Sequence, residues 1–431
     1  MLFSDIGIID ENFEYQPHKW VGVQGAHISF VGDEAPWDAE RYGEVYDGAN
    51  RLLMPGMYNA HAHAPMVLLR GWGEALPLQS WLNDRIFPFE AKMEALDNFW
   101  GTTLAIAEML RYGTVSYSDM YYHADQRFRA CNRAGMKINL GETLLSFDPV
   151  PYQDLPMAEL NARLLREYHM ADDGRLRVDF NLHAEYTSNP TTAASFAEAA
   201  VDAGVCMQVH VSETAAEVEA CKERHGGQTP VEYLAAMGIF DVPTNAAHCV
   251  WLEEGDYAIL RDKAVTVSTN PVSNAKLGSG FARVPRLLDE GITVALGTDG
   301  AASNNNLDMF QDLYVLALVA SGAAQDPTVL PPAKALEIAT RAGALSQGRE
   351  DCGLITEGMR ADICVLDTSG PSWTPETDMV SNIVYAGHGS DVCLTMVDGR
   401  VLYRDGVWPT IDVERARAEV SAATARIAGE L

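Results

Sequence analysis

Eight short apolar segments recur through the middle of this chain, and each ends on a polar residue. The polar residues are Asn59, Asp119, Glu142, His183, His210, His248, Asn270 and Asp299. Segments with helical periodicity separate them, among them 99–112, 195–203, 215–225 and 284–290. Strands that alternate with helices over roughly 300 residues are typical of a (β/α)8 barrel. The sequence therefore predicts an α/β fold with such a TIM barrel at residues 55–354. A doubly wound open sheet is the alternative, but no G-x-G-x-x-G follows the first strand.

The two ends of the chain resemble each other and differ from the middle. Residues 1–54 have the pattern of short strands divided by glycines and acidic turns, and similar short strand segments occur again at 361–366 and 393–401. We expect both termini to form one small β-sandwich domain, built from residues 1–54 and 355–410. The tail at 411–431 is rich in Ala, Arg and Glu and predicts a C-terminal surface helix.

Composition argues against several classes of partner. The chain has 431 residues and a formal net charge of −29, which disfavours nucleic-acid backbones and anionic membranes as partners. No apolar run approaches the roughly 18–20 residues that span a membrane, and the acidic N-terminus lacks the layout of a signal peptide. Seven widely spaced cysteines without a C-x-x-C fit reduced thiols. We expect a cytoplasmic enzyme that acts on a small molecule and forms a homo-oligomer.

The strand ends carry a set of side chains that bind metals. His61 and His63 form a His-x-His pair, and residues i and i+2 of a strand point to the same side. His210, His248 and Asp299 end later strands, and the carboxyl ends of barrel strands meet at one face. Each residue alone has an ordinary structural explanation, such as a helix cap for Asp299. Together they favour a metal centre, with zinc as the expected ion and Fe²⁺ as the alternative.

The fourth strand and the residues after His210 refine this centre. Two-metal hydrolases of this architecture usually bridge their metals with a lysine near strand four, but residues 177–188 contain none. The sequence therefore predicts one Zn²⁺ per chain. Glu213 follows the fifth strand, so its carboxylate can turn over the attacking water and transfer a proton. The alternative is a glutamate that only favours a helix N-terminus. Whether His248 ligates the metal or contacts the water stays open.

Six motifs together resemble those of the amidohydrolase superfamily, and more narrowly its 5′-methylthioadenosine/S-adenosylhomocysteine deaminases. The motifs are HAHAPMVLLRG, SDMYYH, HVSET, AAHCVWL, NPVSNAKLGSG and LGTDGAASNNNLDMF. The resemblance extends from about Leu53 to Ile411, which is nearly the whole chain.

The resemblance implies a role for each candidate residue. The implied metal ligands are His61, His63, His210 and Asp299. Glu213 would shuttle the proton, His248 would lie beside the attacking water, and Asp299 would help a proton reach the departing ammonia. Trp81 would flank the base and Glu90 would accept hydrogen bonds from ribose hydroxyls. The remaining implied substrate-binding residues are His183 and Ser303.

The implied reaction is the hydrolytic deamination of an adenine nucleoside, such as 5′-methylthioadenosine, adenosine or 5′-deoxyadenosine. An alternative is an aminohydrolase or chlorohydrolase of another amino-heterocycle, such as a guanine-like base, a pterin or a triazine. A catalytically inactive scaffold of the same fold is a third reading, but such relatives typically lose metal ligands and this chain keeps all of them.

One position departs from the pattern of relatives that accept S-adenosylhomocysteine. Those proteins place arginine around the third strand, where it pairs with the carboxylate of the substrate. This chain has no arginine between Arg133 and Arg163, and Glu142 occupies the matching position. A carboxylate there would repel another carboxylate. We therefore predict that Glu142 contacts the substrate region and disfavours S-adenosylhomocysteine.

Overall fold

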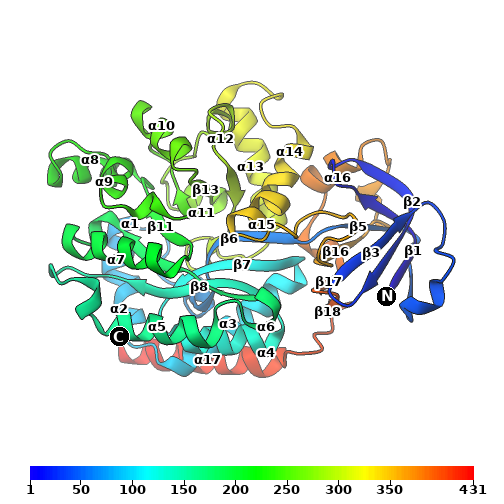
Figure 1. Cartoon of the computed structure of the whole chain (residues 1–431), viewed down its shortest axis with the longest axis horizontal. Helices are drawn as coiled ribbons and strands as arrows, with labels where there is room; N and C mark the ends of the chain where they lie inside the picture. The colour runs from blue at the N-terminus through cyan, green and yellow to red at the C-terminus, as the bar shows by residue number, and fades with distance from the viewer.

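The computed structural model covers residues 1–431 and contains a closed barrel beside a second sheet (Figure 1). The barrel strands are β6 (Met57–His63), β7 (Thr114–Tyr121), β8 (Lys137–Leu144), β10 (Phe180–Ala184), β11 (Met207–Val211), β12 (Thr244–His248), β13 (Thr266–Thr269), β14 (Val294–Leu296) and β15 (Asp299–Gly300). Neighbouring strands pair in parallel, and the short β9 (Leu176–Val178) pairs with β8 just before β10 begins. The predicted α/β barrel is confirmed.

Strands β14 and β15 together form the eighth strand and close the ring. β14 pairs with β13, whereas β15 pairs with β6. Gly297 and Thr298 separate the two, and Asn59 of β6 spans this gap. Its Nδ2 donates to Thr298 Oγ1 at 2.7 Å, and its Oδ1 accepts from Thr298 N at 3.1 Å. A Cβ at Gly297 would lie 2.9 Å from the backbone of His61, so the closure requires glycine.

Helices surround the barrel and follow its strands in the chain. The longer ones are α3 (Ala95–Arg111), α4 (Ala124–Ala134), α5 (Pro156–Tyr168), α7 (Pro190–Ala203), α8 (Ala215–Arg224), α10 (Glu254–Asp262) and α13 (Met309–Ala324). Shorter ones are α1 (Leu78–Trp81), α2 (Phe87–Glu90), α6 (Ala171–Gly174), α9 (Pro230–Ala236), α11 (Pro271–Lys276), α12 (Val284–Asp289), α14 (Pro332–Glu337), α15 (Gly343–Ser346) and α16 (Met379–Tyr385). A cluster of 100 buried apolar residues joins these helices to the strands and gives the barrel a rigid interior.

Both termini contribute to the second sheet. Its strands are β1 (Leu2–Ile9), β2 (Tyr15–Gln24), β3 (His27–Gly32), β4 (Val45–Asp47), β5 (Arg51–Pro55), β16 (Ile363–Asp367), β17 (Val392–Val397) and β18 (Arg400–Arg404). Their order is β18-β17-β16-β5-β1-β2-β3, with β4 beside β1, so hydrogen bonds connect all eight strands in one sheet. A separate cluster of 15 buried apolar residues belongs to this sheet.

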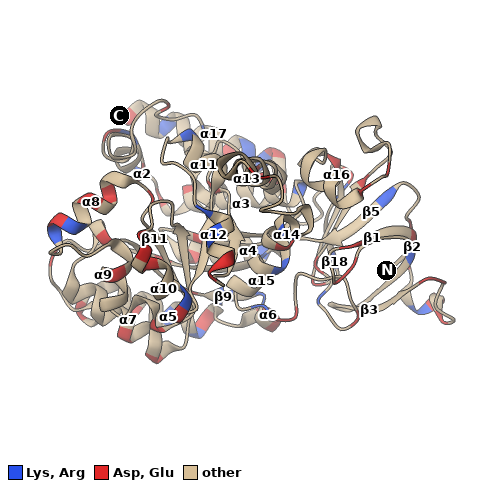
Figure 2. Ribbon diagram, turned by 90° about the horizontal axis from the view of Figure 1, so that it is seen from above, with Lys and Arg blue, Asp and Glu red and all other residues tan.

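The C-terminal helix α17 (Val413–Glu430) lies along α3 of the barrel (Figure 1). Thr424 Oγ1 donates to the carbonyl of Leu68 at 2.9 Å, and Arg426 Nη2 contacts Asp97 Oδ2 at 2.5 Å. No helix of the protein combines the length and the apolarity needed to cross a membrane. Asp and Glu are spread over the helices of the barrel and over the second sheet (Figure 2).

A buried ion cluster joins the barrel to the second sheet. Lys137 begins β8, and its Nζ lies 2.6 Å from Asp362 Oδ1 and 2.6 Å from Asp398 Oδ1. The hydroxyl of Tyr58 also donates to Asp362. Burial alone raises the pKa of Asp362, but Lys137 outweighs this effect and holds the pKa below its usual range. The ammonium group therefore pairs with the fully buried Asp362 and with the partly buried Asp398, which Arg360 also contacts at 3.2 Å.

We expect Lys137→Met to lower the free energy of unfolding by about 3–5 kcal/mol, because it leaves the buried Asp362 carboxylate without a cation, whereas Asp398 keeps Arg360 at 3.2 Å. Denaturant unfolding followed by circular dichroism measures the change. The matched control is Lys334→Met, whose lysine pairs with Glu337 on the surface at 2.9 Å and should cost less than about 1 kcal/mol. Equal losses in the two variants would contradict the role of the cluster.

Candidate metal centre and catalytic pocket

Four of the predicted metal ligands converge at the carboxyl ends of the barrel strands. His63 Nε2 lies 3.2 Å from Asp299 Oδ1 and 3.3 Å from His210 Nε2, and His61 Nε2 lies 3.7 Å from Asp299 Oδ1. All four side chains are buried. Two of these three separations are close to the edge, about 3.3 Å, of a tetrahedron whose metal–ligand bonds are about 2.0–2.1 Å long, and the third is longer. The geometry is therefore that of a site for a small divalent cation.

Backbone carbonyls orient two of these imidazoles. His63 Nδ1 lies 2.5 Å from the carbonyl of Met120, and His210 Nδ1 lies 2.7 Å from the carbonyl of His183. A carbonyl only accepts, so each Nδ1 carries the hydrogen and each Nε2 presents its lone pair to the cluster. This is the tautomer that a metal ligand needs.

The protonation of the cluster also fits a metal. His61 Nε2 is buried and has no hydrogen-bond partner, a costly arrangement unless a cation accepts the lone pair. Burial lowers the pKa of His61 and of His210 well below the usual range, so both rings are neutral. Without a cation in the site, Asp299 raises the pKa of His63, and the neighbouring imidazoles hold the pKa of Asp299 well below its usual range despite burial, so Asp299 is ionised. The residues therefore fit a bound divalent metal.

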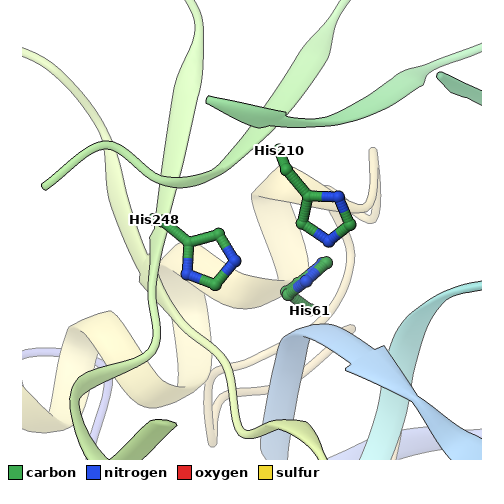
Figure 3. A group of neighbouring side chains, drawn as sticks. All are labelled: His61, His210 and His248. Atoms are coloured by element: carbon green, nitrogen blue, oxygen red, sulfur yellow. The ribbon is translucent and has the colours of Figure 1, made fainter. Parts of the chain in front are cut away.

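His248 belongs to the same cluster but is held differently. Figure 3 shows its ring turned toward the rings of His61 and His210, and the donor atoms of these three residues lie within 4.8 Å of one another. Its Nδ1 faces the carboxamide nitrogens of Asn274 at 3.0 Å and Asn270 at 3.4 Å. Amide nitrogens donate, so Nδ1 accepts and Nε2 carries the ring hydrogen.

Glu213 lies in the loop between β11 and α8, on the cavity side of the cluster. Its Oε2 is 3.8 Å from His248 Nε2, and its Oε1 accepts from Ser279 Oγ at 3.0 Å. Burial raises the pKa of the Glu213 carboxyl, although His248 and Ser279 oppose this shift. A raised pKa suits a carboxylate that takes up a proton and releases it again.

Three residues near the cluster have backbone φ angles that residues other than glycine rarely adopt. The φ angles are 50° at Ser212, 78° at His248 and 61° at Asp299. Left-handed conformations at residues other than glycine are uncommon and are concentrated at functional sites. Here they turn the chain at the ends of β11, β12 and the eighth strand.

The cluster opens into a cavity whose wall combines apolar side chains with a few convergent polar groups, the usual composition of a small-ligand site. The predicted substrate residues Trp81, Glu90, His183 and Ser303 all line it, together with Glu213, His248 and Asp299. Trp81 and Glu90 come from α1 and α2, which follow the first barrel strand. No lysine or arginine lines the cavity.

Glu142 does not lie with the other predicted substrate residues. Its two carboxylate oxygens accept from the backbone nitrogens of His123 at 3.0 Å and Ala124 at 2.7 Å. It therefore caps the N-terminus of α4, where a negative charge is stabilising, and it is not among the residues that line the cavity. The prediction that Glu142 faces the substrate is corrected accordingly.

Several polar residues that were not predicted from the sequence touch the candidate catalytic groups. Ser273, Asn274 and Ser279 contact Asp299, His248 and Glu213 in turn, and they share the motif NPVSNAKLGSG. Glu217 accepts from the backbone nitrogens of Ser212 at 2.9 Å and Glu213 at 2.7 Å. The signal in the sequence was this motif, a dense run of polar residues directly after an apolar strand, which does not indicate the catalytic group that each side chain contacts.

The fold and this donor cluster define a metal-dependent hydrolase of the barrel type, and the chain belongs to the amidohydrolase family, whose model matches residues 52–402. It is 42% identical over 388 residues to the 5-methylthioadenosine/S-adenosylhomocysteine deaminase of Desulforamulus reducens, covering 90% of this chain and 89% of that protein. It is 40% identical over 395 residues to the 5′-deoxyadenosine deaminase of Methanothermobacter thermautotrophicus, covering 92% and 91%.

Among solved structures, the crystal structure of an adenosine deaminase from Xanthomonas campestris with bound zinc superimposes with a TM-score of 0.92. The two chains are 30% identical, and the match covers 99% of this chain and 98% of that one. The family resemblance inferred from the motifs is confirmed.

We expect His61→Asn to lose most of the zinc that the parent protein retains through dialysis, because it removes a ligand. The matched control is His183→Asn, which changes another histidine at a strand end but keeps the backbone carbonyl that orients His210. Elemental analysis should find one zinc per chain in the parent and in the control. A control that loses its zinc, or a His61 variant that keeps it, would contradict this assignment.

Proposed function

We propose that this protein removes the amino group of an adenine nucleoside by hydrolysis and releases ammonia. The observation that carries the proposal is the position of Glu213. Its carboxylate lies beside His248 and next to four convergent metal-binding groups, in a cavity lined by both apolar and polar side chains. The named deaminases, at 40–42% identity over most of their length, support the same reaction.

One zinc ion, held by His61, His63, His210 and Asp299, completes this site in our proposal. A divalent ion there supplies Lewis acidity, which lowers the pKa of a coordinated water toward neutrality. Zinc is favoured because three imidazoles and one carboxylate in tetrahedral spacing form a typical donor set for that metal. A single ion is favoured because strand β10 offers no lysine to bridge a second one.

In the proposed reaction, the water oxygen bonds to the ring carbon that carries the amino group, and the carbon–nitrogen bond then breaks. Of the two hydrogens of the water, one goes to the ring nitrogen and one leaves with ammonia. Glu213 takes the first proton from the water and delivers it to the ring nitrogen. His248 donates through Nε2 toward the attacking oxygen, and Asp299 helps the second proton reach the departing nitrogen.

The residues that line the cavity favour a nucleoside over a free base as the substrate. Trp81 offers an aromatic face against which a purine can stack, and Glu90 offers a carboxylate to two ribose hydroxyls. His183 and Ser303 complete the polar positions of the wall. A free base would leave the Glu90 carboxyl without ribose hydroxyls to bind and with only Tyr121 as a hydrogen-bond partner, at a cost in free energy.

No lysine or arginine lines the cavity, and this affects which 5′ groups of a nucleoside can bind there. A substrate carboxylate would lose its hydration on entering and would gain no cation in return. We therefore favour nucleosides with an uncharged 5′ group, such as 5′-methylthioadenosine, 5′-deoxyadenosine and adenosine. This preference no longer depends on Glu142, which caps a helix.

Ammonia release from a substrate panel tests the proposal. We expect turnover of the three uncharged adenine nucleosides and a kcat/KM for S-adenosylhomocysteine at least about tenfold lower, equivalent to about 1.4 kcal/mol of lost pairing. The comparison compounds are guanine, a pterin and an amino-triazine. A protein that is inert on every adenine nucleoside but active on one of these bases would contradict the proposal. A preference for S-adenosylhomocysteine would contradict the role assigned to the uncharged cavity.

A further inference from the structure

One short segment, Asn270–Gly280, contacts all three groups that handle protons in the proposed reaction. It includes α11 and the turn that follows. Ser273 Oγ donates to Asp299 Oδ2 at 2.6 Å, Asn274 Nδ2 lies 3.0 Å from His248 Nδ1, and Ser279 Oγ donates to Glu213 Oε1 at 3.0 Å. These three side chains are 0%, 1% and 3% exposed. None of them lines the substrate cavity, so they act through other residues.

The turn around Ser279 is built to hold its hydroxyl in one place. Gly278 and Gly280 flank it with φ angles of 70° and 108°, which residues other than glycine rarely adopt. The backbone nitrogen of Ser279 donates to the Asn274 carbonyl at 2.9 Å, and its carbonyl accepts from Trp251 Nε1 at 2.6 Å. Both backbone groups are bonded, so the backbone position of Ser279 is fixed, and its hydroxyl donates from there to one oxygen of Glu213.

Asn274 determines which nitrogen of His248 carries the hydrogen. Its carboxamide nitrogen donates to Nδ1, and Asn270 reinforces this contact at 3.4 Å. The ring hydrogen therefore lies on Nε2, the atom nearest to Glu213 at 3.8 Å. His63 and His210 have the opposite tautomer, because backbone carbonyls face their Nδ1 atoms. The contacts to the Nδ1 atoms therefore leave a lone pair on Nε2 of His63 and His210, as a metal ligand needs, and a hydrogen on Nε2 of His248.

We propose that Ser279 and Asn274 are positioning residues for the deamination. Ser279 fixes the Glu213 carboxylate, and Asn274 fixes the His248 ring with its Nε2 hydrogen toward the reacting atoms. This inference rests on the proposed function, because it assigns the two residues to the proton transfers of that reaction. Loss of either contact leaves substrate binding and the metal ligands in place but misorients a group that acts in the transition state.

Single-turnover kinetics of Ser279→Ala and Asn274→Ala tests this proposal. We expect the single-turnover rate constant of each to fall about tenfold to a hundredfold, the range that one hydrogen bond to a charged or polarised group supplies. KM should change by less than about threefold, because the substrate does not touch either residue. Zinc content should stay at one ion per chain.

Two matched variants separate positioning from stability. Ser116→Ala removes a buried hydroxyl that donates to Gln347, and Asn161→Ala removes a buried amide that donates to Tyr152 at 3.1 Å. Both lie away from the cavity. We expect them to lower Tm as much as the test variants do while the single-turnover rate constant stays at the parent value.

Asn274→Asp keeps the shape of the side chain but can only accept, so its rate constant should fall below that of Asn274→Ala.

A double-mutant cycle identifies the group through which Ser279 acts. In a Glu213→Gln background, adding Ser279→Ala should lower the residual rate by less than about twofold, because the carboxylate that it positions is gone.

Parent-like rate constants in Ser279→Ala and Asn274→Ala, or zinc lost in proportion to rate, would overturn the inference. All rates are measured with whichever panel compound the parent protein deaminates. Inactivity of the parent on adenine nucleosides therefore counts against the proposed function alone.

Discussion

The convergence of four buried donor groups at one end of the barrel is the constraint on which the rest of the structure depends. Three pairs of their donor atoms lie 3.2–3.7 Å apart, and the Nε2 of His61 has no hydrogen-bond partner. Neutral imidazole lone pairs and a carboxylate that face one another in a buried site are unfavourable without a cation. The carbonyls of Met120 and His183 enforce this arrangement by holding the hydrogens on the far nitrogens. The site is therefore organised for a cation by its backbone as well as by its side chains.

The barrel brings these groups together from strands that are far apart in the sequence. Closure by β14 and β15 places Asp299 opposite the His-x-His strand, and the closure itself depends on Gly297 and on the bonds from Asn59 to Thr298. A rigid apolar core holds the strand ends in register, so the site can carry left-handed residues at His248 and Asp299. The stability of the barrel is thus what allows a strained and polar site to persist.

Much of the fold and of the candidate site could be predicted from the sequence. The eight strand ends were placed within four residues because buried parallel strands give short apolar runs with sharp polar limits. The donor set could be found because an i, i+2 pair and later strand ends must share one face. The function of Glu142 could not be found, because it depends on the start of α4 next to β8. The contacts of Asn274 and Ser279 were equally inaccessible, because polar residues in a loop follow no period and their direction is set by the glycines around them.

The central claim is that one metal ion and the groups around it deaminate an adenine nucleoside. It is tested most directly by titrating metal-free protein with zinc while ammonia release from 5′-methylthioadenosine is followed. We expect the rate to rise linearly and to reach its plateau at one equivalent of zinc per chain. A plateau only at two equivalents would contradict the single-metal site. Full activity in protein shown by elemental analysis to be free of metal would contradict the metal centre itself.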